Sequence, residues 1–170
     1  YVEMADYPSF FLTQWTISVW VKSTSQRIDF MTLFGNGSGN DLRMAGGVMA
    51  LSIYNGAFSN FIGTRRINDG QWHHVVAMFN GSESLDKVKL YVNGREARLN
   101  VIHGRLFRTF GDAKRTLKFG AGGGERFRFK GRLDEVRIYK SLPENDEIAV
   151  LANADGSAPR FVAPHLGYTY

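Results

Sequence analysis

The stretch F-K-G-R-L-D-E-V-R-I-Y-K-S-L-P-E-N-D-E-I, from Phe129 to Ile148, contains the clearest succession of secondary-structure signals in the chain. Gly131 precedes an alternating run from Leu133 to Tyr139, which predicts a β-strand. Pro143 and the acidic residues after it predict the first turn of a short helix that ends near Ala152. We therefore expect a strand followed by a helix, and we order the other elements around this pair.

The remainder of the chain consists of short apolar runs separated by turn residues. Asn55-Gly56 and Asn93-Gly94 are strong hairpin signals, and residues 36–41 read as a loop. With 19 glycines between the runs, the pattern is typical of an all-β fold, a two-sheet antiparallel β-sandwich with one short C-terminal helix. We expect one domain over residues 1–156 and a tail or linker over 157–170. The strands are predicted at 1–4, 15–22, 30–34, 48–54, 58–64, 71–79, 88–92, 96–102, 116–119 and 125–130.

The composition excludes several classes of protein. The absence of cysteine excludes disulfide bonds and thiolate metal sites, and no apolar run approaches the 18 residues of a membrane span. The chain begins with Tyr1 rather than with methionine, which favours a fragment or a processed product.

Positive charge is concentrated in one part of the sequence. The formal net charge is +5, and from Arg95 to Arg132 eleven Lys and Arg residues stand against three Asp and Glu. Such clustering indicates an anionic partner, which is an acidic polysaccharide, a nucleic acid or an anionic surface. A solvated basic face without a partner explains the same pattern and stays open.

Four motifs occur in order and together resemble a known family. They are W-T-I-S-V-W-V-K at 15–22, D-G-Q-W-H-H-V-V at 69–76, V-K-L-Y-V-N-G at 88–94 and G-R-L-D-E-V-R-I-Y-K-S-L-P-E-N-D-E-I at 131–148. They resemble a laminin G-like domain of the concanavalin A-like lectin/glucanase superfamily, over about residues 1 to 153. The resemblance implies a curved jelly roll of two antiparallel sheets. The opening strand and turn of the family would lie before Tyr1.

Asp134 is the candidate metal ligand. It shares a strand face with Val136 and Ile138, so we expect it to point inward, where a carboxylate needs hydrogen bonds or a cation. The resemblance implies a structural calcium, which prefers six to eight oxygen ligands, with Glu3 and Asp6 as candidate partners. An aspartate that accepts hydrogen bonds from backbone N–H groups is the alternative.

The candidate ligand-binding residues are mostly arginines. Arg126, Arg128 and Lys130 alternate with Phe127 and Phe129, which predicts that the cations project together while the phenyl rings face the core. The arginine fork suits sulfate and carboxylate groups, whereas single-stranded nucleic acid requires exposed aromatic platforms among the cations. We therefore expect an anionic glycan and no nucleic acid. The ligand-binding prediction is completed by Arg105, Arg108 and Tyr54.

The sequence contains no recognisable catalytic pattern. The E-x-D-x-x-E arrangement of family-16 glycoside hydrolases is absent, although retaining hydrolysis needs two paired carboxylates. His73 and His74 are adjacent on a predicted strand, so they point to opposite faces and do not share a site.

These observations predict a non-catalytic, lectin-like carbohydrate-binding module of a larger secreted, periplasmic or cell-surface protein. Its partners would be a polysaccharide or glycan and the other domains of its parent, without membrane insertion. A protein–protein interaction or adhesion module on the same sandwich is the alternative.

Overall fold

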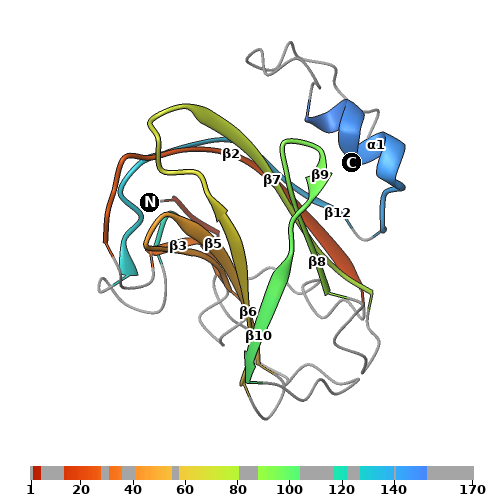
Figure 1. Ribbon diagram of the computed structural model, residues 1–170, viewed down its shortest axis with the longest axis horizontal. Helices are drawn as coiled ribbons and strands as arrows, with labels where there is room; N and C mark the ends of the chain where they lie inside the picture. Colours follow the sequence, from red (N-terminus) through yellow and green to blue (C-terminus); the bar gives the residue numbers. More distant parts are fainter. Residues whose placement is uncertain are drawn as a thin grey trace.

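In the part of the chain that it describes, the computed structural model shows two antiparallel β-sheets that face each other, with one helix outside them (Figure 1). It describes residues 2–4, 14–27, 31–35, 41–54, 58–80, 88–103, 117–121, 127–139 and 141–152. None of the helical residues in these ranges forms a segment long and apolar enough to cross a membrane. The predicted tail at 157–170 lies outside the described residues.

Over the described ranges, the larger sheet has seven strands in the order β1-β11-β3-β4-β5-β6-β10. The hairpin of β5 and β6 was predicted from Asn55-Gly56 and is confirmed, since Ser52 is the register partner of Asn60. The strands are β1 (Val2–Met4), β3 (Met31–Gly35), β4 (Asp41–Ala45), β5 (Val48–Tyr54), β6 (Phe58–Arg66), β10 (Leu99–His103) and β11 (Leu117–Phe119).

The smaller sheet has five strands among the residues described, in the order β12-β2-β7-β8-β9. Strand β2 pairs with the central strand β7 over its whole length, from Trp15 opposite Phe79 to Lys22 opposite Trp72. The strands are β2 (Trp15–Lys22), β7 (Trp72–Phe79), β8 (Val88–Val92), β9 (Arg95–Glu96) and β12 (Arg132–Tyr139), and the helix is α1 (Asn145–Leu151).

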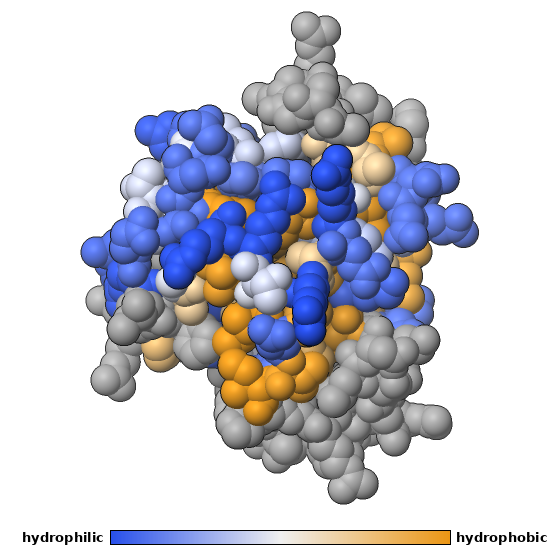
Figure 2. Space-filling model, in the orientation of Figure 1, coloured by the Kyte–Doolittle hydropathy of each residue, from blue (hydrophilic) through white to orange (hydrophobic). Residues whose placement is uncertain are grey.

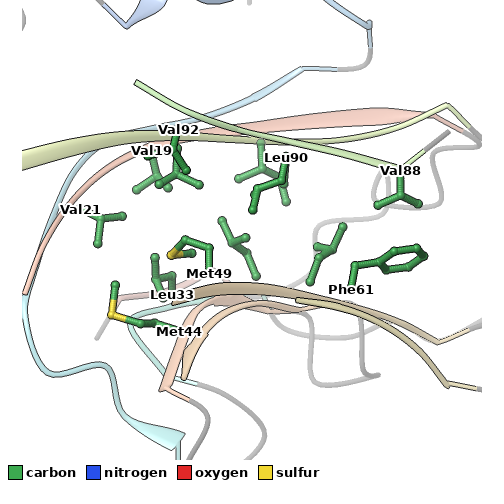
Figure 3. Packing of buried hydrophobic residues seen from close by; sticks show 14 of the residues in the cluster. Val19, Val21, Leu33, Met44, Met49, Phe61, Val88, Leu90 and Val92 are labelled. Carbon is green, nitrogen blue, oxygen red and sulfur yellow. The ribbon is translucent and has the colours of Figure 1, made fainter. Parts of the chain in front are cut away.

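The core lies between the sheets, and along strands such as β2, β5 and β7 every second residue faces it. Figure 3 shows side chains of the smaller sheet, such as Val19 and Leu90, opposite Leu33 and Met49 of the larger one. Phe61 is 0% exposed at the same interface. Full burial of one such side chain contributes roughly 1.5–3 kcal/mol, so this interface is the main source of stability.

The helix covers part of the outer face of the smaller sheet. Ile148 packs against Val76, Met78 and Tyr91, which all point away from the core. The Tyr91 hydroxyl donates a hydrogen bond to Asn145 Oδ1 at 3.0 Å, and so ties the start of the helix to the sheet.

Three elements differ from the sequence prediction. The predicted return strand at 96–102 is divided, because β9 pairs with β8 whereas β10 crosses to the other sheet and pairs with β6. Asp41 to Ala45 form β4, where no strand was expected. Within the predicted strand at 125–130, only Arg128 among the described residues forms a β-bridge.

Candidate functional site

A basic pocket lies where β2 ends and β12 begins, two points that are side by side in Figure 1. Its volume is about 480 Å³. Its described lining contains the cationic residues Lys22, Lys130 and Arg132 and no acidic residue. The other lining residues are small and are supplied by three connecting segments, namely Ser23, Thr24, Ser25, Gly70 and Gly131.

Hydrogen bonds hold the wall of the pocket in place. The Ser23 hydroxyl donates to the Lys130 carbonyl oxygen at 2.6 Å and accepts the Ser25 N–H at 3.1 Å. The Gly70 N–H donates to the Ser23 carbonyl at 3.0 Å. These bonds join three segments that are far apart in the sequence, so the backbone that carries the cations is fixed before any ligand arrives.

Gly131 is required by close packing in this wall. A Cβ atom at this position would overlap the Lys22 carbonyl oxygen and would lie 2.6 Å from the Phe129 ring. Because only glycine allows this approach, the chain can bring Lys130 and Arg132 to opposite sides of the same turn, next to Lys22.

The charges in the pocket repel one another. Lys22 and Arg132 are direct register partners on β2 and β12, and like charges that lie directly opposite each other destabilise a sheet. Asp134 lies on the same face, two residues beyond Arg132, but it does not line the pocket. An anion in the pocket would relieve this repulsion.

The prediction that Asp134 points inward is wrong. Asp134 is exposed, and its Oδ1 accepts a hydrogen bond from the backbone N–H of Glu135 at 2.8 Å. Glu135 adopts a left-handed φ of 46°, and the register with β2 shifts between Asp134 and Arg137. This β-bulge inserts one residue into β12 between Asp134 and Val136. As a result Leu133, and not Asp134, faces the core together with Val136.

The described residues do not fit a calcium site around Asp134. They contain no group of three or more His, Asp or Glu side chains that could hold a metal ion. One Asp134 oxygen already accepts a backbone N–H, which is the arrangement that the alternative interpretation expected. The side chain of Glu3 and all of Asp6 lie outside what the structure describes, so calcium stays a prediction.

Of the predicted ligand-binding residues, the structure brings Lys130 into the basic pocket. Arg128 is exposed close by in the sequence, and Phe129 packs against the core as expected. The remaining positions, which are Arg105, Arg108, Arg126 and the side chain of Tyr54, lie outside the described residues. Lys22 and Arg132 were not predicted as ligand-binding residues, although the pairing of the first and fourth motifs as neighbouring strands would have placed them together.

Residues 1–149 match the laminin G-type family that is described as the concanavalin A-like lectin/glucanases superfamily. The chain belongs to this superfamily. No curated protein matches the sequence.

Solved structures share this superfamily fold at low sequence identity. The sialidase module CBM40 of Ruminococcus gnavus, bound to α2,3-sialyllactose, is 16% identical with a TM-score of 0.64, over 89% of this chain and 95% of that one. Domain 4 of AbnA, a GH43 arabinanase of Geobacillus stearothermophilus, bound to arabinotriose, is 22% identical with a TM-score of 0.58, over 88% and 71%. Domains LG4-5 of the mouse laminin α1 chain are 11% identical with a TM-score of 0.62, over 85% and 40%.

The superfamily includes glucanases, and one pair of buried polar residues on the smaller sheet has the spacing of a catalytic pair. Ser18 Oγ and His74 Nε2 lie 2.7 Å apart, as in a nucleophile and its base. Both residues are 1% exposed, and burial followed by the charge of Arg137 lowers the pKa of His74 to about 4. Within the described chain His74 Nδ1 has no hydrogen-bond partner, so no carboxylate orients the ring. A substrate cannot reach this pair, and its role is to hold β2 against β7.

The two neighbouring histidines point to opposite faces, as expected. His73 Nε2 lies 2.9 Å from Asp69 Oδ1, and its Nδ1 lies 3.1 Å from Asn93 Nδ2. His74 contacts Ser18 and the Trp20 ring instead, with ring centroids 5.3 Å apart. The partners of the two rings are separate, so the histidines form neither a metal pair nor an acid–base pair.

Proposed function

We propose that this chain is a non-catalytic carbohydrate-binding module for anionic polysaccharides and that the basic pocket binds their sulfate or carboxylate groups. The observation that carries the proposal is the convergence of Lys22, Lys130 and Arg132 on one pocket, in which none of the described lining residues is acidic. Arginine binds such groups through paired hydrogen bonds and lysine binds them as a point charge.

Two further facts support this function. Modules of the same fold have been solved with sialyllactose, which carries a carboxylate, and with arabinotriose. A pocket of about 480 Å³ lies within the usual range of small-molecule sites. We place the module in a secreted, periplasmic or cell-surface protein with other domains, because a protein at these locations has access to polysaccharides.

The experiment is retention on columns of neutral and acidic polysaccharides, at low and at high salt and with calcium or a chelator. We expect retention on acidic polymers that weakens as salt is raised, because surface ion pairs are screened. We expect the same retention with calcium and with the chelator, because the binding groups that we propose are cationic side chains. Failure of every acidic polymer to retain the protein at low salt would contradict the proposal.

The repulsion between Lys22 and Arg132 gives a second prediction, on stability. An oligogalacturonate at about 100 times its Kd should add about 2.7 kcal/mol, which raises the Tm by about 5–10 °C. Lys22→Gln should raise the Tm of the free protein at low salt by about 1–2 °C, since a like-charge pair is removed, and should reduce the shift that the ligand produces. Differential scanning fluorimetry measures both values.

Arg98→Gln is the control for this prediction, because Arg98 is exposed and does not line the pocket. It removes the same charge and should leave the ligand-induced shift unchanged. Equal shifts in wild type and Lys22→Gln would show that the anion binds elsewhere.

A protein-interaction module is the second candidate function, and one observation favours it. Val101 and Ile102 are 45% and 52% exposed on β10, the edge strand of the larger sheet, where Figure 2 shows hydrophobic surface. Exposed apolar residues on a sheet edge are a common feature of protein contacts. Binding to a protein ligand that Val101→Ser abolishes, without retention on any polysaccharide, would favour this function.

A further inference from the structure

A second pocket, with a volume of about 490 Å³, lies between the end of β7, the start of β8 and the segment that leads into α1. This volume is within the usual range of small-molecule sites. Met78 and Tyr91 are buried at its base, with their side chains pointing away from the core, and Leu142 and Pro143 add apolar surface beside them. The pocket therefore has an apolar floor.

The polar residues of the second pocket are accessible, unlike its floor. Asn145 and Asp146 are exposed, and the Lys89 side chain is 40% exposed. All three line the pocket. A ligand can reach their polar atoms without displacing a buried side chain.

These polar side chains offer both donors and acceptors to a ligand. The Lys89 ammonium has three hydrogens and donates to Glu96 Oε2 at 3.2 Å, so hydrogens remain for a ligand. Asn145 Oδ1 accepts the Tyr91 hydroxyl at 3.0 Å, which holds the side chain in place and leaves its amide hydrogens as donors. The Asp146 carboxylate supplies acceptor oxygens.

The charge of the second pocket is opposite to that of the basic pocket. Its described lining contains one cation, Lys89, and two carboxylates, those of Glu144 and Asp146. An anionic group is therefore repelled here. A neutral hydroxyl group both donates and accepts a hydrogen bond, so it can pair with the carboxylate and with the amide or ammonium group.

The two pockets lie on the same face of the smaller sheet, at opposite ends of β2. Lys22 lines the basic pocket, whereas Thr16 of β2 is the register partner of Met78, which lines the second pocket. Lys22 and Thr16 are six residues apart in a strand whose register with β7 is unbroken, so they share a face and lie roughly 20 Å apart. One extended polymer chain can reach both pockets.

We propose that the second pocket binds an uncharged sugar ring of the same polysaccharide whose anionic groups the basic pocket binds. The C–H groups of the ring contact the apolar floor. Its hydroxyl groups accept from Lys89 and Asn145 and donate to Asp146. This inference rests on the proposed function for the class of ligand, but it assigns a separate site with the opposite charge.

The test is an NMR titration of the ¹⁵N-labelled full chain with cellotriose, xylotriose and arabinotriose at high salt, where binding to the basic pocket is screened. We expect at least one trisaccharide to shift the backbone amide signals of Lys89, Asn145 and Asp146. Lys89→Met keeps an unbranched apolar stem and removes the ammonium donors, so it should weaken this binding at least tenfold. Asp146→Ala removes the acceptor and should weaken binding by a similar factor.

Glu96→Gln is the matched control, because Glu96 is the ion-pair partner of Lys89 but does not line the pocket. It breaks the same ion pair while the Lys89 ammonium stays, so it should bind like wild type. The spectrum of each variant also shows whether it is folded.

Three results would overturn the inference. They are no response to any of the three trisaccharides, shifts confined to other parts of the chain, and equal weakening by Lys89→Met and Glu96→Gln. None of them decides the proposed function, because retention on acidic polymers at low salt tests the basic pocket separately.

Discussion

Lowering the pH from about 6.5 to about 4 is expected to remove about 3 kcal/mol of folding stability through His74 alone. Burial lowers the pKa of His74 from its ordinary value of 6.5 to about 4 in the folded protein. Between these values the unfolded chain binds a proton that the folded protein does not, so stability falls as the pH falls. Each unit of difference corresponds to about 1.4 kcal/mol. Above pH 6.5 the contribution is fully present.

The variant His74→Gln separates this contribution from other titrations. A glutamine amide can still accept a hydrogen bond from Ser18 but does not titrate, so its unfolding free energy should change much less between pH 6.5 and pH 4. Urea denaturation at a series of pH values measures the difference. The raised pKa of Asp41 acts in the opposite direction, and the lowered pKa of Asp69 acts only below about pH 3.8, but both are common to the two proteins. Parallel pH profiles would contradict the assignment.

Gly131→Ala should have the largest combined effect on stability and binding. The new Cβ would overlap the Lys22 carbonyl oxygen and press on the Phe129 ring, so the backbone at the start of β12 must move. Overpacking of this kind typically costs about 1–3 kcal/mol. The same movement displaces Lys130 and Arg132, so retention on acidic polysaccharide should weaken even at temperatures where the variant is folded.

Gly46→Ala provides the comparison for this result. Gly46 has a φ of 55°, and a Cβ there would meet nothing within 4 Å. The unfolding free energy of Gly46→Ala should fall by about 1 kcal/mol, because alanine is strained in the left-handed region, and its retention on acidic polysaccharide should equal that of wild type. Equal retention by Gly131→Ala and Gly46→Ala would show that the turn at Gly131 does not position the basic pocket.

The strands were predictable where apolar and polar residues alternate without interruption. Trp15 to Lys22 were predicted as a strand, and β2 has the same bounds. The helix was predicted two residues too early, because Pro143 precedes its N-cap, Glu144, rather than opening the helix. The crossing of β10 to the other sheet was not predictable, since Asn93-Gly94 indicates a hairpin and does not set the length of the returning strand.

The orientation of Asp134 could not be derived from alternation. The rule that every second residue shares a face holds only while the register is unbroken, and a β-bulge inserts one residue. The signal for a bulge is a residue in the left-handed region, and here that residue is Glu135, which seldom adopts it. Sequence alone gave no reason to expect this conformation.

Only the positive charge of the basic pocket was predictable from the sequence, and its position was not. The excess of Lys and Arg between residues 95 and 132 indicated an anionic partner, and Lys130 was named. Lys22 lies more than a hundred residues away in the sequence, and it reaches the pocket because β2 and β12 are neighbours in register. The sequence shows the sign of the charge, whereas strand pairing decides which of the cations meet, so Lys22 and Arg132 were not predicted as ligand-binding residues.

The most direct test of the central claim compares two triple variants on an acidic polysaccharide. The first, Lys22→Gln, Lys130→Gln and Arg132→Gln, removes the cations of the basic pocket. The second, Arg65→Gln, Arg95→Gln and Arg98→Gln, removes three exposed cations that do not line it, so both lose the same net charge. Affinity electrophoresis through a gel that contains polygalacturonate measures the dissociation constant of each. We predict a loss of at least a hundredfold for the first variant and less than about threefold for the second, whereas equal losses would contradict the claim that the basic pocket is the binding site.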